Sequence, residues 1–133
     1  MNVRYINDKD YDTICGWWKS HNMKPISKNI LPDNGRGGII VSYDGINVCA
    51  GFLYLTNSDV SSIEFVVTNK NFKKNKVKNK CLDELFIQLI KLAKDSGSSI
   101  IFTSIRNKNI QKKSLELGFI CSDEKINNYI KIL

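Results

Sequence analysis

The chain of 133 residues is 42% hydrophobic and 25% charged, and its 20 Lys and Arg against 13 Asp and Glu give a formal net charge of +7. This length predicts one domain over residues 1–133, and the composition excludes a disordered or low-complexity chain. The apolar runs are shorter than the about 20 residues of a bilayer-spanning helix, and the first residues lack the apolar stretch of a secretory signal, so we expect neither.

The first 38 residues predict a strand, a helix and a long loop. Residues 3–6 alternate weakly, as a strand does. The next apolar positions keep the spacing of a helix that begins at Asp8 or Asp10 and runs to about His21. Residues 23–38 contain both prolines of the chain, which indicates an irregular loop.

Three strands joined by short turns are predicted next, at residues 38–43, 46–55 and 60–68. The Asp-Gly pair at 44–45 is typical of a two-residue hairpin turn. Alternation divides the middle of the third strand between two faces, with Ile63, Phe65 and Val67 opposite Glu64 and Val66.

Two helices alternate with strands in the C-terminal half. A continuous apolar stripe predicts a helix over residues 78–96, which Gly97 ends. Residues 99–105 are apolar on both faces, as in a buried central strand. A helix over 107–117 is predicted to end at Gly118.

The last residues predict a hairpin of strands 119–122 and 127–132. Antiparallel strands that lead into a strand-loop-helix-strand unit indicate a mixed sheet. We therefore predict an α+β (mixed α/β) fold, with a central mixed sheet of about six or seven strands flanked by about four helices.

Most of the net positive charge lies in one segment. An eleven-residue stretch without acidic residues contains Lys70, Lys73, Lys74, Lys76, Lys78 and Lys80. Like charges at this density repel one another unless an anion lies nearby. The anion could belong to a phosphate-bearing small molecule, a nucleic acid or an acidic protein, and the lysines could also be a solvated face.

The cysteines do not suggest a metal site. Cys15, Cys49, Cys81 and Cys121 show no C-x-x-C spacing, and His21 is the single histidine. Each cysteine has apolar neighbours in the sequence, which favours reduced thiols packed as small hydrophobic groups. This usage predicts a cytoplasmic protein without a bound metal.

The order of elements and several strings resemble the GNAT superfamily of acyl-CoA-dependent N-acyltransferases over nearly the whole chain. Asn107 followed by Leu117-Gly118-Phe119 is similar to the end of that family's fold. Residues 17–19, 31–35 and 50–58 resemble a compact subgroup of small GNAT-like proteins of phages and bacteria.

The resemblance implies an N-acetyltransferase that moves an acetyl group from acetyl-CoA directly to an amine in a ternary complex. It implies that Glu64 is the general base, and that residues of the strand and the following loop bind the cofactor. These cofactor-binding residues are Phe65, Val66, Val67, Lys73, Lys74, Asn75, Lys76, Val77 and Lys78. Glu64 could instead point outward and pair with a lysine, and Asn107 could contact the pantetheine arm or cap its own helix.

The acceptor side is predicted from the first helix and the loop after it. An exposed tryptophan could form a wall of the acceptor pocket, and of the adjacent Trp17 and Trp18 we expect one in the core and one partly exposed. Both could also be core residues. Asn34 lies in a glycine-rich segment that we interpret as a flexible lip of the acceptor site.

Two positions depart from the family pattern. The family's loop has the pattern Q/R-x-x-G-x-G/A, whereas the loop here contains no glycine and has Lys74, Lys76 and Lys78 at the corresponding places. Many members have a tyrosine that protonates the leaving thiolate, and the matching residue here is Ser114. The thiolate would then be protonated by water, by Ser114 as a relay or by another residue, and Tyr54 is the first tyrosine to consider.

These departures leave an alternative: a catalytically silent GNAT-like protein that binds a protein or nucleic acid through its lysine-rich loop. Nucleic acid is not favoured, because Phe72 is the only aromatic residue among the lysines. The resemblance also suggests a homodimer, in which the edge strand of the final hairpin could supply the contact. The acceptor amine cannot be read from the sequence.

Overall fold

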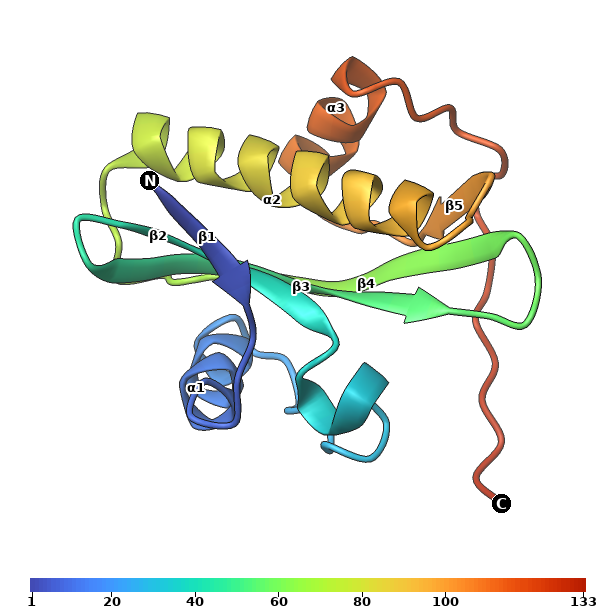
Figure 1. Ribbon diagram of the computed structural model, residues 1–133, viewed down its shortest axis with the longest axis horizontal. Coiled ribbons are helices and arrows are strands. Elements are labelled where there is room, and N and C mark those ends of the chain that lie inside the picture. Colours follow the sequence, from blue (N-terminus) through green and yellow to red (C-terminus); the bar gives the residue numbers. More distant parts are fainter.

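A five-stranded mixed sheet forms the centre of the computed structural model, which describes residues 1–133 (Figure 1). The strand order follows the sequence, and the strands are β1 (Asn2–Tyr5), β2 (Gly38–Tyr43), β3 (Ile46–Leu55), β4 (Val60–Thr68) and β5 (Ile100–Thr103). The first four strands are antiparallel, and β5 runs parallel to β4. The bounds predicted for β2, β3 and β4 are confirmed.

Helices cover both faces of the sheet (Figure 1). On one face lie α1 (Tyr11–Ser20) and the short 3₁₀ helix η1 (Pro32–Gly35). On the other face lie α2 (Asn75–Asp95) and, beside it, α3 (Lys108–Glu116). Each face has its own apolar core: Leu85, Phe86 and Leu89 of α2 are fully buried on one side, and Ile14 and Trp18 of α1 on the other.

The helix ends follow from local hydrogen bonding. Gly97 and Gly118 have φ of 95° and 94°, and each follows the C-cap residue of α2 or α3, as predicted. Asp10 is the N-cap residue of α1, but its carboxylate does not cap the helix. It instead accepts hydrogen bonds of 2.7 and 2.9 Å from the Arg4 guanidinium, which ties α1 to β1.

The strand and helix counts are slightly lower than predicted, and the final hairpin is absent. Residues 119–122 and 127–132 form no strand, and residues 120–133 make no backbone hydrogen bond with one another or with the sheet. Alternation identifies a segment that can be a strand, but a strand also needs a partner backbone. The prediction that residues 99–105 form a buried central strand was wrong. β5 is the last strand of the sheet, and its Ile100 and Phe102 are exposed.

A β-bulge in β4 overturns the predicted division of its faces. Ala50 pairs with Val67 and Phe52 with Glu64, so two residues of β4, Phe65 and Val66, lie opposite one residue of β3. Phe65 adopts a φ of 58°, which is unusual for a bulky side chain. As a result Ile63 and Val66 pack toward α2, whereas Phe65 and Val67 pack toward α1.

No helix of the structure is both long enough and apolar enough to span a bilayer.

Candidate active site

The connection between β4 and α2 presents a row of free backbone N–H groups. No side chain caps α2, and the first helical hydrogen bond runs from the N–H of Lys78 to the carbonyl of Lys74. The N–H groups of residues 73–77, which precede it, donate no hydrogen bond. Unpaired N–H groups at the positive end of a 21-residue helix are suited to bind an anion.

This connection does not require glycine. No residue between 66 and 78 has a positive φ, and Lys74 has a φ of −78°. An L-residue therefore adopts the backbone without strain, which explains how lysines can occupy the positions where the family has glycine. The loop before α2 is also shorter than predicted, because residues 75–78 already form the first turn of the helix.

The lysines around this helix end have no acidic partners. None of the six lysines between residues 70 and 80 forms an ion pair. Burial lowers the pKa of Lys78, and the nearby charge of Lys73 lowers it further. Since a bound anion would offset this repulsion, the side chains add to the anion preference of the N–H groups.

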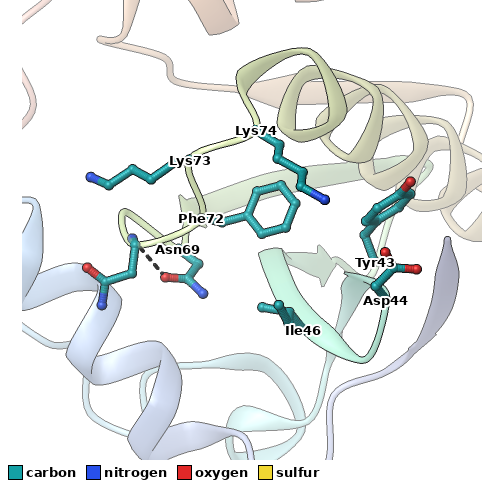
Figure 2. Close-up of a pocket in the computed structure, with 8 residues that line it drawn as sticks. Tyr43, Asp44, Ile46, Asn69, Phe72, Lys73 and Lys74 are labelled. Carbon is teal, nitrogen blue, oxygen red and sulfur yellow. Dashed lines mark hydrogen bonds between the residues drawn. The ribbon is translucent and has the colours of Figure 1, made fainter.

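A hollow of about 370 Å³ opens beside the same connection, at the β2–β3 turn (Figure 2). Phe72 projects into its centre, Lys74 points toward Tyr43, and Lys73 points away from the hollow (Figure 2). The Lys74 ammonium lies 5.8 Å from the centre of the Tyr43 ring. The hollow is lined by Tyr43, Asp44, Ile46, Asn69, Asn71, Phe72, Lys73 and Lys74, so it does not contain Glu64.

β4 and β5 separate before β4 ends. Their pairing stops at Ile63 and Thr103, whereas β4 continues to Thr68. At the last pair the Thr103 hydroxyl donates a 2.8 Å hydrogen bond to the carbonyl of Ile63. The edge of β4 from residue 64 onward therefore has no strand partner on the β5 side, and this open backbone leads directly to the free N–H groups of α2.

Glu64 lies where this separation begins. Its side chain is partly buried on the face toward α1 and accepts a 2.6 Å hydrogen bond from the Ser62 hydroxyl. Burial raises the pKa of Glu64, and the Ser62 hydrogen bond opposes that rise in part. Glu64 forms no ion pair with a lysine. The Glu64 carboxylate therefore binds a proton more readily than a solvent-exposed glutamate does.

Tyr54 lies on the same face of the sheet as Glu64. Burial raises the pKa of Tyr54, and the charge of Glu64 raises it further, so the phenol stays protonated at neutral pH. Its ring lies 6.2 Å from the Phe65 ring, and its hydroxyl donates a 2.9 Å hydrogen bond to the carbonyl of Ile30. Tyr54 therefore connects the Glu64 face to the loop that precedes η1.

Both tryptophans of α1 are buried, so the expectation that one is partly exposed was wrong. Trp17 is 7% exposed and Trp18 is fully buried. The Trp18 ring packs against Phe52 and Phe65, and its indole N–H has no hydrogen-bond partner. Asn34, by contrast, is exposed in η1 with a φ of 52°. The tryptophans are therefore core residues on the α1 side of the sheet, whereas Asn34 is a surface residue.

The chain matches no protein-family profile and no curated protein by sequence. By structure it resembles solved acetyltransferases. The aminoglycoside N-acetyltransferase AAC(6')-Iy, solved with coenzyme A, superposes with a TM-score of 0.67 at 16% identity, over 98% of this chain and 100% of that chain. N-acetylglutamate synthase from Neisseria gonorrhoeae, solved with coenzyme A and L-arginine, gives 0.73 at 17% identity, over 96% of this chain and 29% of that chain. An acetyltransferase from Trypanosoma brucei gives 0.67 at 14% identity, over 97% and 99% of the two chains.

The chain has the GNAT fold. Within this GNAT fold, two predicted site residues on or beside α3 make local contacts. The Asn107 side chain caps α3 by accepting hydrogen bonds from the N–H groups of Asn109 and Ile110, at 2.9 and 3.1 Å. Ser114 is buried, and its hydroxyl donates a 2.9 Å hydrogen bond to the carbonyl of Ile110. The helix that bears Ser114, α3, lies with α2 on one face of the sheet (Figure 1), whereas Tyr54 packs against the core of the opposite face.

Sequence reasoning missed two polar residues beside Glu64 in this candidate site. Ser62 bonds the Glu64 carboxylate, and Thr103 bonds the carbonyl at the point where β4 and β5 separate. The i, i+2 spacing of Ser62 and Glu64 on a strand was the available signal, because such residues share a face. Nothing in the sequence marks Thr103, because its hydrogen bond to the Ile63 carbonyl depends on where the parallel pairing of β4 and β5 stops.

Proposed function

We propose that this chain is an N-acetyltransferase that transfers the acetyl group of acetyl-CoA to an amine in a ternary complex, acting as one domain over residues 1–133. One observation carries the proposal. The open edge of β4 begins at Glu64 and leads along the chain to the free N–H groups at the start of α2. Coenzyme A is bound in solved neighbours of the same fold, which supports the choice of cofactor.

Acetyl-CoA would supply an acetyl group held as a thioester. The N–H groups of residues 73–77 and the surrounding lysines would bind its pyrophosphate, and the backbone of residues 65–67 would bind its pantetheine arm. No residue of the connection has a positive φ, so its backbone is unstrained in this conformation. The GNAT-fold resemblance also assigns Asn107 to the pantetheine, although its side-chain oxygen already caps α3.

Glu64 would accept the proton that the acceptor amine loses as its nitrogen attacks the thioester carbonyl. The bond from the carbonyl carbon to sulfur then breaks, and the leaving thiolate takes up a proton from solvent or from Tyr54. We favour Tyr54 over Ser114, because Tyr54 shares the face of Glu64 and holds its proton. A serine hydroxyl is far less acidic, and that of Ser114 is directed into its own helix.

The acceptor would enter on the α1 face, between the Glu64 strand and the loop of residues 22–37. Tyr54 and Tyr11 hold this loop by hydrogen bonds to the carbonyls of Ile30 and Ile26, at 2.9 and 2.7 Å. Asn34 would lie at the outer lip. The four free cysteines fit a protein that works in a reducing cytoplasm.

Release of the coenzyme A thiol tests this function directly. We expect thiol release from acetyl-CoA that depends on an added amine, measured across polyamines, amino acids, aminoglycosides and lysine peptides. Activity with one class would identify the acceptor chemistry. No amine-dependent release with any class, together with no acetyl-CoA binding, would contradict the proposal.

The pH dependence of the reaction should report on Ser62. Its hydroxyl stabilises the charged form of Glu64, so Ser62→Ala is expected to raise the pKa of Glu64 and move the rise of kcat/KM to higher pH. Ser61→Ala is a matched control, because the Ser61 hydroxyl is buried on the same strand without a hydrogen-bond partner. Equal pH profiles for both variants would remove Ser62 from the tuning of Glu64.

A further inference from the structure

The hollow at the β2–β3 turn has no part in the proposed reaction. Its volume of about 370 Å³ falls within the range of about 300–1,000 Å³ that is usual for small-molecule sites. Phe72 and Tyr43, which line it, belong to the apolar core between the sheet and α2. Glu64 pairs with Phe52 and lies on the α1 face. A molecule in the hollow is therefore on a different face of the sheet from Glu64.

Hydrogen bonds fix the side of the hollow that belongs to the β4–α2 connection. The N–H of Asn69 donates a 2.7 Å hydrogen bond to the carbonyl of Val48, and its side-chain amide donates one of 3.0 Å to the carbonyl of Asn47. Its side-chain oxygen accepts a 3.0 Å hydrogen bond from the N–H of Asn71. The N–H of Phe72 donates one of 3.1 Å to the carbonyl of Asn69. These bonds hold the connection against β3, so the hollow is formed before any ligand binds.

The floor of the hollow is apolar. Phe72 projects into its centre, and the rings of Phe72 and Tyr43 meet edge to face with centres 6.4 Å apart (Figure 2). Ile46 lies below Phe72 in the same view and is 50% exposed (Figure 2). An apolar or aromatic group that covers Ile46 and contacts the two rings would be stabilised by removal of this surface from water.

Opposite charges lie together on one side of this floor. The Lys74 ammonium is 5.8 Å from the centre of the Tyr43 ring, and Asp44 is next to Tyr43 on the same side of the hollow (Figure 2). Neither Lys74 nor Asp44 forms an ion pair. A purely anionic ligand would be repelled by Asp44, and a purely cationic one by Lys74. A ligand that carries both charges would be attracted by both side chains.

We propose that this hollow binds a free α-amino acid with an apolar or aromatic side chain. Asp44 accepts hydrogen bonds from the α-ammonium group, and Lys74 donates to the α-carboxylate. The side chain of the amino acid packs on Phe72 and Ile46. Because its amine is held away from the face that bears Glu64, the bound amino acid is not the acetyl acceptor. The hollow is thus a second binding site, separate from the acceptor site.

An NMR titration of the ¹⁵N-labelled chain tests the ligand chemistry. The probes are L-phenylalanine, 2-phenylethylamine, which lacks the carboxylate, and 3-phenylpropanoate, which lacks the amine. We expect L-phenylalanine to shift the amide signals of residues 43–46 and 69–74. Each analogue should bind about 3- to 10-fold more weakly, because each loses one charged hydrogen-bonding group.

Two variants identify the partner of each charge. Asp44→Asn removes the carboxylate and suits the turn, because asparagine tolerates the φ of 50° at this position. It should weaken binding of L-phenylalanine but not of 3-phenylpropanoate. Lys74→Met should weaken binding of L-phenylalanine but not of 2-phenylethylamine. The control Asp59→Asn/Lys91→Met changes exposed charges elsewhere and should bind all three probes as wild type does.

Three results would each overturn the amino-acid site. The first is an absence of shifts at tens of millimolar L-phenylalanine. The second is equal affinity for the three probes, which would indicate apolar contact without recognition of the charges. The third is a set of shifts confined to the strand around Glu64, which would place the amino acid in the acceptor site instead. None of these readouts requires acetyl-CoA, so the outcome is independent of the proposed transferase activity.

Discussion

Replacing Glu64 by glutamine is expected to lower kcat/KM for acetyl transfer by about 10²- to 10⁴-fold, the usual contribution of a positioned general base. Glutamine keeps the shape of the side chain and can still bond the Ser62 hydroxyl, but it cannot take the proton from the amine. Glu116→Gln, an exposed acid on α3, is the matched control and should leave the rate unchanged.

The stability of the same variant separates chemistry from folding. Burial raises the pKa of Glu64 in the folded chain above its unfolded value, so keeping the carboxylate charged at neutral pH costs stability. Glu64→Gln should therefore melt at the same temperature as wild type or higher. Full activity in this variant would contradict the assignment, and lost activity with a lower melting temperature would indicate unfolding instead.

Trp18→Ala is expected to lower the free energy of unfolding by about 3–5 kcal/mol, the usual cost of truncating a buried aromatic residue. Trp18 is fully buried and packs between Phe52 and Phe65, with ring centres 6.1 and 6.4 Å away. Because Phe65 forms the β4 bulge, the loss should also loosen the strand that bears Glu64. Urea unfolding followed by circular dichroism measures the cost.

Trp18→Phe provides the comparison. It keeps an aromatic ring between Phe52 and Phe65 and removes an indole N–H that has no hydrogen-bond partner. We expect it to cost clearly less than Trp18→Ala, since removing an unsatisfied buried donor offsets part of the lost volume. Equal costs for the two variants would mean that the N–H has a partner in solution.

The sequence predicted the meander of β2, β3 and β4 because its signals are local. The Asp44-Gly45 pair allows a tight turn with φ of 50° and 76°, and the flanking residues alternate as strands do. The ends of α2 and α3 were predictable for the same reason, since Gly97 and Gly118 supply the positive φ that ends a helix.

The bulge at Phe65 and the extent of β5 depend on contacts between distant segments. A single extra residue in β4 reverses the facing of every side chain beyond it, and no residue type at 65 or 66 marks that shift. Residues 127–132 show the opposite case. Their apolar and polar residues follow the pattern of a strand, but no partner backbone pairs with them.

The candidate site combines both kinds of information. Glu64 and the lysine-rich segment stand out in the sequence as a strand acid and a charge run. The free N–H groups of residues 73–77 follow from where α2 begins, which the sequence placed about one turn too late. Ser114 was aligned with a catalytic tyrosine, but its burial and its bond to Ile110 direct attention to Tyr54.

Calorimetric titration with acetyl-CoA tests the central claim most directly. The proteins are wild type, Lys73→Ala/Lys74→Ala/Lys76→Ala, and the control Lys91→Ala/Lys94→Ala/Lys112→Ala, which removes the same charge from exposed positions elsewhere. We predict micromolar binding by wild type and the control. The triple variant at residues 73, 74 and 76 should bind acetyl-CoA about 10- to 100-fold more weakly, because it loses the lysine charges but keeps the free N–H groups. The difference in affinity between wild type and this variant should shrink at high salt. No binding at millimolar acetyl-CoA, or equal affinity in all three proteins, would contradict an acyl-CoA site at the N-terminus of α2.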